Sequence, residues 1–81
     1  MNHYVYIVKC ADGTFYTGWT THLEKRIEVH NQGKGARYTR CRRPVTLIYH
    51  EIYSDKSSAL RREAAIKKLS RKQKEELIRG D

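Results

Sequence analysis

The first 20 residues constrain the fold most, because they carry two β-forming runs around a short polar break. Tyr4 to Cys10 and Thr14 to Thr20 are rich in β-branched and aromatic residues, which favour strands. Ala11-Asp12-Gly13 lies between them and ends in glycine, the residue that adopts positive φ most readily. A three-residue loop places Tyr6 and Tyr16 on one face of the hairpin, whereas a two-residue loop would place them on opposite faces. We therefore predict a β-hairpin with a three-residue loop.

A helix and a third strand are expected next. Thr21 begins a capping box of the form S/T-x-x-E, so a short helix should follow and run to about Asn31. Its apolar residues Leu23 and Ile27 have helical spacing and should face the sheet. Thr46 to Tyr53 is rich in β-formers and predicts the third strand.

The C-terminal part of the chain predicts two successive helices. Ser54 is expected to cap a helix from Asp55 to Leu69, and Ser70 begins a second capping box before a helix from Lys72 to Arg79. The order is then β-β-α-β-α-α, which predicts an α+β fold with a three-stranded antiparallel sheet flanked by helices. Because 81 residues support one core, residues 1–81 are expected to form a single domain.

Basic residues are in excess, with 17 Lys and Arg against 9 Asp and Glu and a formal net charge of +8. The excess is concentrated in Lys34 to Arg43 and in Leu60 to Lys74. The first stretch predicts a basic loop with an interleaved tyrosine, a pattern suited to phosphate contacts and to stacking on an unpaired base. We therefore expect a nucleic acid as the partner, contacted by Lys34, Arg37, Tyr38, Arg40, Arg42 and Arg43.

Other classes of protein are disfavoured by features that the sequence lacks. No apolar run approaches the ~18 residues of a membrane-spanning helix, and the N-terminus does not resemble a signal peptide, so we expect a cytoplasmic protein without membrane association. Cys10 and Cys41 are too few for a disulfide framework or a zinc cage, and we expect reduced thiols. Neither a Gly-rich phosphate loop nor a Ser/His/Asp set is present.

Glu63 is out of place in its predicted helix, because it falls within an apolar arc that contains Ala59, Leu60 and Ile66. A buried, ionised carboxylate needs an arginine, a hydrogen-bond network or a hard divalent cation. One interpretation is therefore a metal ligand. The other is a helix-face glutamate paired with Arg62 or Lys67.

Four further side chains are candidates for a site. Arg26 and His30 are four residues apart on one helix and project from the same side, which places a phosphate donor beside a group that titrates near neutral pH. The alternative is a solvated helix face that ends in a histidine. Tyr6 and Tyr16 either are core aromatics or orient a water molecule and a phosphate oxygen.

The motifs and their order resemble the GIY-YIG endonuclease superfamily. Val5-Tyr6-Ile7 is followed by Tyr16-Thr17-Gly18, then by Arg26 in a short helix and Glu63 in a later one. The chain is most similar to the small single-domain bacterial YhbQ/YazA-like proteins, whose basic stretch resembles Gly35 to Pro44. The resemblance covers essentially the whole chain and implies the fold derived above.

The same resemblance implies a metal-dependent endonuclease that hydrolyses phosphodiester bonds in DNA, in repair or recombination. It implies that Tyr6 acts as, or positions, the general base and that Tyr16 hydrogen-bonds the scissile phosphate. Arg26 would stabilise the added negative charge, and Glu63 would hold one Mg²⁺ or Mn²⁺. His30 matches a position where members carry His or Tyr, and we expect it to relay the proton.

The chain departs from the family pattern at Trp19, where several relatives have Lys after the glycine. This departure favours an alternative function, a nucleic-acid-binding module that turns over slowly or not at all. For the endonuclease, we expect no appended DNA-binding domain that selects a site. We therefore expect recognition of single-stranded or branched DNA with low sequence specificity, and a partner protein that supplies further specificity.

Overall fold

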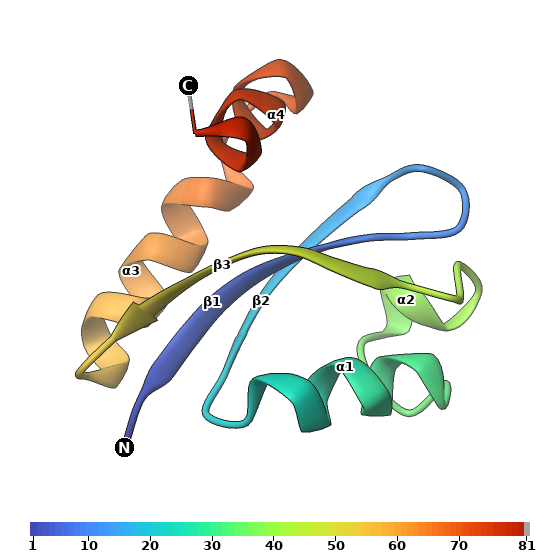
Figure 1. The fold of residues 1–81 in the computed structure, drawn as a ribbon, viewed down its shortest axis with the longest axis horizontal. Helices are drawn as coiled ribbons and strands as arrows, with labels where there is room; N and C mark the ends of the chain where they lie inside the picture. Colours follow the sequence, from blue (N-terminus) through green and yellow to red (C-terminus); the bar gives the residue numbers. More distant parts are fainter. Residues whose placement is uncertain (81) are drawn as a thin grey trace.

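The computed structural model describes residues 1–80, and its architecture is a three-stranded antiparallel sheet with helices on both faces (Figure 1). Its strand order is β2-β1-β3, so β1 is central. The α+β fold predicted from the sequence is confirmed, and among residues 1–80 no helix is long and apolar enough to cross a membrane. The elements are β1 (His3–Lys9), β2 (Phe15–Thr20), α1 (Leu23–Asn31), α2 (Arg37–Arg40), β3 (Thr46–Tyr53), α3 (Lys56–Lys67) and α4 (Arg71–Arg79).

The predicted hairpin loop is confirmed. The Cys10 N–H donates to the Thr14 carbonyl at 2.8 Å, and the Gly13 N–H donates to the Cys10 carbonyl at 2.9 Å. Gly13 adopts a φ of +85°, which is why glycine is suited to the last loop position. In this register Tyr6 lies opposite Gly18, so Tyr6 and Tyr16 share one face of the sheet.

Strand β1 is buried on both faces and divides the core into two clusters. Val5 and Ile7 pack with Ala59 and Ile66 of α3. On the other face, Tyr6 and Val8 belong to a second cluster, to which α1 contributes partly buried side chains. The members of this cluster outside β1 are Cys10, Val45, Tyr16, Leu23, Ile27 and Leu47. Figure 1 shows α3 and α4 on one side of the sheet and α1 and α2 on the other.

The two predicted capping boxes have opposite outcomes. The box at Thr21 is wrong, because α1 has His22 as its N-cap and no side chain caps it. The Thr20 hydroxyl instead accepts the His22 N–H at 3.1 Å, one residue before the helix begins. The box formed by Ser70 and Gln73 is confirmed, with both reciprocal hydrogen bonds present at the start of α4.

Helix α3 is shorter than predicted at both ends. Asp55 rather than Ser54 is its N-cap, and the Asp55 carboxylate accepts the Ser58 N–H at 2.8 Å and the Ser58 hydroxyl at 2.8 Å. A carboxylate can accept both bonds at once, which explains why it takes the cap position. The helix ends at Lys67 rather than at Leu69.

The sequence predicted that the basic segment is a loop, but part of it is helical. Residues Arg37–Arg40 form the single-turn helix α2, and its first backbone bond runs from the Thr39 N–H to the Ala36 carbonyl at 3.1 Å. Thr39 is fully buried in this turn. The buried threonine anchors the turn against the end of α1, because its hydroxyl contacts the His30 ring.

Candidate active site

A buried tyrosine and a buried histidine form the centre of the candidate site. Tyr6 projects from β1, and His30 lies in the last turn of α1. The Tyr6 hydroxyl hydrogen-bonds with His30 Nε2 across 2.7 Å, and the exposed fractions of the two residues are 1% and 0%. The Tyr16 ring meets the His30 ring edge-on, with 5.5 Å between the ring centroids. The structure thus brings together three of the residues that the sequence singled out.

Two glycines make room for this pair. A Cβ on Gly18 would lie 2.6 Å from the Tyr6 hydroxyl oxygen and 3.2 Å from the Tyr16 ring. A Cβ on Gly35 would lie 2.3 Å from His30 Nδ1. The distances of 2.6 Å to the Tyr6 hydroxyl and 2.3 Å to His30 Nδ1 are far below van der Waals contact. Any side chain at either glycine would therefore displace the phenol or the imidazole. Gly18 was noted only as part of a motif, and its close contact with Tyr6 follows from the strand register.

Arg26 on α1 and Glu63 on α3 both affect the pKa of the Tyr6 phenol. Burial raises the pKa of Tyr6 to about 12, while hydrogen bonding with the Arg26 side chain and its positive charge act to lower it. The charges of Tyr16 and Glu63 raise the same pKa. Arg26 therefore acts on the phenol as a hydrogen-bonding neighbour, whereas Glu63, which pairs with Lys67, acts on it through charge alone.

His30 is set up as a neutral imidazole. Burial lowers its pKa, and the nearby Arg26 charge lowers it further. A neutral imidazole has one ring nitrogen free to accept a proton. The histidine therefore provides what a protonated phenol lacks, which is a ring nitrogen with a lone pair that can take up a proton.

The Glu63 carboxylate is largely buried, with 16% of its side chain exposed, and its Oε2 lies 3.3 Å from Lys67 Nζ. The ion pair predicted with Lys67 is therefore present. Arg62, the other predicted partner, instead contacts both carboxylate oxygens of Glu51, at 2.8 and 3.0 Å. The sequence analysis did not identify this pair, because Glu51 and Arg62 lie on different elements and carry no motif.

Within residues 1–80 there is no group of three or more His, Cys, Asp or Glu side chains that would hold a metal ion alone. A single carboxylate still suits Mg²⁺ or Mn²⁺ at a phosphodiester, because such ions use one or two protein carboxylates together with phosphate oxygens and water. The donor set around Glu63 therefore fits an ion that the substrate helps to bind, rather than a closed protein cage.

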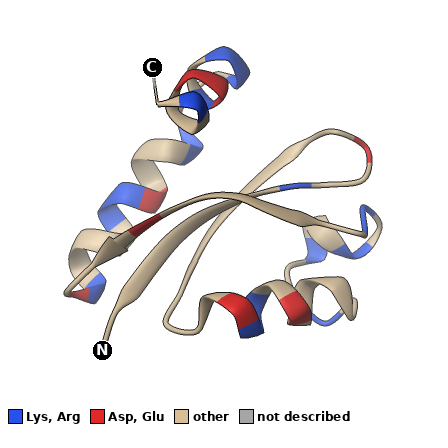
Figure 2. Cartoon of the chain, in the orientation of Figure 1, with Lys and Arg blue, Asp and Glu red and all other residues tan. Residues whose placement is uncertain are grey.

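Figure 2 shows the Lys and Arg positions on and around α2, and the side chains of this basic segment fall into two groups by their contacts. Lys34, Arg37 and Arg40 are exposed, and their side chains make no hydrogen bond or ion pair within residues 1–80. Arg42 and Arg43 are bound internally. The Arg43 Nε donates to the Arg40 carbonyl at 2.9 Å, so its guanidinium is held against the protein.

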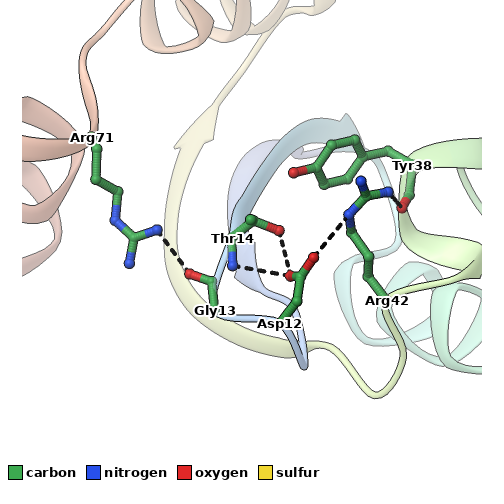
Figure 3. A network of polar contacts seen from close by, with 6 residues as sticks. All are labelled: Asp12, Gly13, Thr14, Tyr38, Arg42 and Arg71. Atoms are coloured by element: carbon green, nitrogen blue, oxygen red, sulfur yellow. Dashed lines mark hydrogen bonds and ion pairs between the residues drawn. The ribbon is translucent and has the colours of Figure 1, made fainter.

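Arg42 connects the basic segment to the hairpin loop, as Figure 3 shows. Its Nε lies 3.0 Å from the Asp12 carboxylate, and its Nη1 donates to the Tyr38 carbonyl at 2.8 Å. Arg71 approaches the same loop from α4 and donates to the Gly13 carbonyl at 2.8 Å. The loop is thus held between two arginines from distant parts of the chain, an arrangement that the sequence analysis did not foresee.

Tyr38 is 37% exposed, and two neighbours already contact its ring. The Arg42 guanidinium carbon lies 4.0 Å from the ring centroid, and the Tyr16 ring stacks on Tyr38 with 5.9 Å between centroids. Stacking of a nucleic-acid base on Tyr38 stays a prediction. In this structure the ring links Arg42 to Tyr16, which lies beside the Tyr6–His30 pair.

Comparison with known proteins agrees with the geometry. The family model described as the GIY-YIG catalytic domain matches residues 2–76. A UPF0213 protein of Staphylococcus haemolyticus is 60% identical over 76 residues, which cover 94% of this chain and 93% of the relative. A UPF0213 protein of Halobacterium salinarum is 56% identical over 76 residues, covering 94% of this chain and 99% of the relative.

Two solved structures are also similar. The solution NMR structure of the UPF0213 protein BH0048 from Bacillus halodurans is 50% identical, with a TM-score of 0.63, and the match covers 96% of this chain and 83% of that one. The solution NMR structure of the E. faecalis protein EF2693 is 46% identical, with a TM-score of 0.67 and coverage of 99% and 85%. The chain therefore belongs to the GIY-YIG family and, within it, to the small UPF0213 proteins.

Proposed function

We propose that this protein is a metal-dependent endonuclease that hydrolyses phosphodiester bonds in DNA. The observation that carries the proposal is the 2.7 Å hydrogen bond between the Tyr6 hydroxyl and His30 Nε2, formed in a buried setting beside Arg26 and Glu63. Hydrolysis of a phosphodiester requires a base for the attacking water, a cation for the developing charge and an in-line geometry. Tyr6 and His30 have chemistry suited to the base, and Arg26 beside them has chemistry suited to the cation.

The base is the tyrosine and histidine acting together. A phenol whose pKa is raised to about 12 is a poor base alone at neutral pH. In the proposed step the Tyr6 oxygen takes a proton from the attacking water, and the phenol proton passes to His30 Nε2. The resulting hydroxide forms the new bond to phosphorus while the bond to the leaving oxygen breaks.

The charge on the phosphate is balanced by the remaining side chains. Tyr16 donates a hydrogen bond to a phosphate oxygen, and Arg26 stabilises the negative charge that develops on it. Glu63 would hold the divalent ion, Mg²⁺ or Mn²⁺, which supplies positive charge to the phosphate when bound. Lys67, which pairs with Glu63 and is the more exposed of the two, would give up this contact to the ion.

The substrate is proposed to be DNA that is single-stranded or branched, recognised with little sequence specificity in repair or recombination in the cytoplasm. The exposed residues Lys34, Arg37 and Arg40 support backbone contacts, because such contacts depend on charge and not on sequence. A partner protein would supply further specificity. The proposed domain comprises residues 1–81.

The test is a cleavage assay with single-stranded, forked and supercoiled DNA in Mg²⁺ or Mn²⁺. Glu63→Gln and Arg26→Ala are each expected to lower the rate by about 10²-fold or more, since each removes charge stabilisation in the transition state. Glu28→Gln and Lys25→Ala change exposed side chains of α1 and should cut as the wild type does. Circular dichroism checks that all variants fold.

Two outcomes would contradict the proposal. Cutting that survives both Glu63→Gln and Arg26→Ala would come from a contaminating nuclease. Binding of DNA by the wild type without any cutting in either metal would instead support the binding module, the alternative that Trp19 favours.

A further inference from the structure

Both ring nitrogens of His30 are hydrogen-bonded inside the protein. Nε2 faces the Tyr6 hydroxyl at 2.7 Å, and Nδ1 faces the Thr39 hydroxyl at 2.9 Å. Thr39 lies in α2 and is fully buried, as His30 is. A neutral imidazole carries one hydrogen, so one of these contacts is donated by the ring and the other is accepted by it. The other hydrogen-bond partners of the Tyr6 and Thr39 hydroxyl groups decide which ring nitrogen donates and which accepts.

The Thr39 end of the ring settles the position of the imidazole hydrogen. The Thr39 hydroxyl lies 2.9 Å from the Ala36 carbonyl, and a carbonyl oxygen only accepts hydrogen bonds. The single hydroxyl hydrogen is therefore donated to Ala36. What the hydroxyl turns toward His30 is a lone pair, so Nδ1 carries the hydrogen and donates it to Thr39.

The Tyr6 end leads to the same assignment independently. The Arg26 guanidinium, the other hydrogen-bonding neighbour of the phenol, is a donor only. The phenol hydrogen is therefore donated to His30 Nε2, which must be bare to accept it. Both ends of the ring thus require the tautomer with hydrogen on Nδ1.

We propose that Thr39 is a positioning residue that holds His30 in the Nδ1–H tautomer, so that Nε2 stays free to accept the proton of Tyr6. The proposal rests on the proposed function for its catalytic consequence, but the tautomer itself does not. With the opposite tautomer the ring would donate to the phenol oxygen, which would occupy the lone pair needed for the attacking water. Gly35, whose Cβ would collide with Nδ1, leaves the space that brings ring and hydroxyl together.

The direct test is NMR of protein labelled with ¹⁵N in its histidines, where long-range ¹H–¹⁵N correlations distinguish protonated from bare ring nitrogens. The wild type is expected to show a protonated Nδ1 and a bare Nε2 at His30, identified by the signals that His30→Gln lacks. Thr39→Val, which keeps the shape but removes the acceptor, should move the ring toward the Nε2–H tautomer. Thr39→Ser keeps the hydroxyl and should give the wild-type pattern.

Thr46→Val is the matched control, because Thr46 is exposed on β3 and should leave the His30 signals unchanged. A wild-type His30 with hydrogen on Nε2 would overturn the proposal. So would a folded Thr39→Val protein whose His30 signals match those of the wild type. If Thr39→Val does not fold, the wild-type spectrum alone still decides the tautomer.

Cleavage gives the second readout. Thr39→Val should lower kcat by about ten- to a hundred-fold with little change in KM, as expected for loss of a group that orients a histidine, while Thr39→Ser should restore the rate. Equal kcat for the wild type and a folded Thr39→Val would overturn the positioning role. If the wild type cuts no DNA, the proposed function fails, whereas the NMR result still decides the tautomer separately.

Discussion

Gly18 has little freedom to vary, because its position opposite Tyr6 leaves no space for a side chain. In Gly18→Ala the new Cβ would lie 2.6 Å from the Tyr6 hydroxyl oxygen, so the phenol must move away from His30. We expect the free energy of unfolding to fall by about 1–3 kcal/mol, as in other overpacked cores, and cleavage to be lost. Urea titration and the cleavage assay measure the two effects.

Thr46→Ala serves as the control for this substitution, since Thr46 is an exposed strand residue of β3 that contacts neither tyrosine. It should change stability and cutting little. Wild-type cutting by Gly18→Ala would show that the Tyr6 phenol need not sit where the structure has it, and would argue against its role as the base.

His30 makes stability depend on pH. Burial, followed by the Arg26 charge, lowers its pKa below the ordinary value of 6.5, so the unfolded chain binds this proton more readily than the folded one. The contribution is therefore complete above about pH 6.5 and is lost as the pH falls through the lowered pKa. The charged and titratable side chains that face His30 are Arg26, Tyr6 and Tyr16.

We expect the free energy of unfolding of the wild type to fall steadily from pH 7 to pH 5, and that of His30→Gln to fall less steeply. Urea titrations at half-unit steps of pH measure both slopes. Parallel curves for the two proteins would mean that His30 takes up its proton equally well in the folded state.

Residue patterns and the family resemblance singled out the candidate residues of the site but not their contacts. Tyr6, Tyr16, Arg26 and Glu63 were found because their motifs and helical spacing are visible along the chain. Thr39 was not, because it carries no motif and its importance depends on burial in α2, a segment that the sequence had predicted to be a loop. A buried hydroxyl beside a histidine is a property of packing, which local sequence does not encode.

At the scale of the elements, the starts of the helices show which sequence patterns predict the structure correctly and which do not. Ser70 and Gln73 form the predicted capping box. The equivalent pattern at Thr21 does not form one, because α1 begins one residue later, with His22 as its N-cap. Strand β3 has the predicted bounds because its run of β-formers is uninterrupted. In this chain the tertiary position of a segment thus overrides the prediction from the four-residue capping pattern at Thr21, but not the prediction from the eight-residue run of β-formers in β3.

The cap of α3 can be tested with neighbouring substitutions. Asp55→Ala removes an acceptor for both the backbone and the hydroxyl of Ser58, so the melting temperature should fall by roughly 4 °C. Ser54→Ala, at the position first predicted as the cap, should leave it nearly unchanged. Thermal unfolding followed by circular dichroism distinguishes the two, and an equal loss for both would contradict the assignment of Asp55.

At the scale of the whole molecule, the basic side chains differ in whether they are bound to other groups of the protein. Lys34, Arg37 and Arg40 are exposed, while the guanidinium of Arg42 is held by Asp12. We expect Arg37→Ala combined with Arg40→Ala to weaken binding to single-stranded DNA of any sequence. The salt dependence of log K should lose roughly 1.4 units of slope, because two phosphate contacts are removed.

The matched control removes the same charge from another part of the surface. Lys68→Ala with Lys72→Ala changes exposed lysines near α3 and α4, away from α2 in Figure 1, and should leave the slope close to that of the wild type. Fluorescence anisotropy at several salt concentrations measures the slopes. An equal loss in both double variants would place the DNA across both regions.

Strand β1 has a consequence for how a substrate reaches the phenol. Val5 and Ile7 attach this strand to α3, while the side chain between them, Tyr6, belongs to the layer of α1. The two layers therefore share a single backbone, and separating them would disrupt β1. Under the proposed reaction we expect the sheet to keep its shape, and the bending or fraying that exposes a scissile phosphate to be contributed by the DNA.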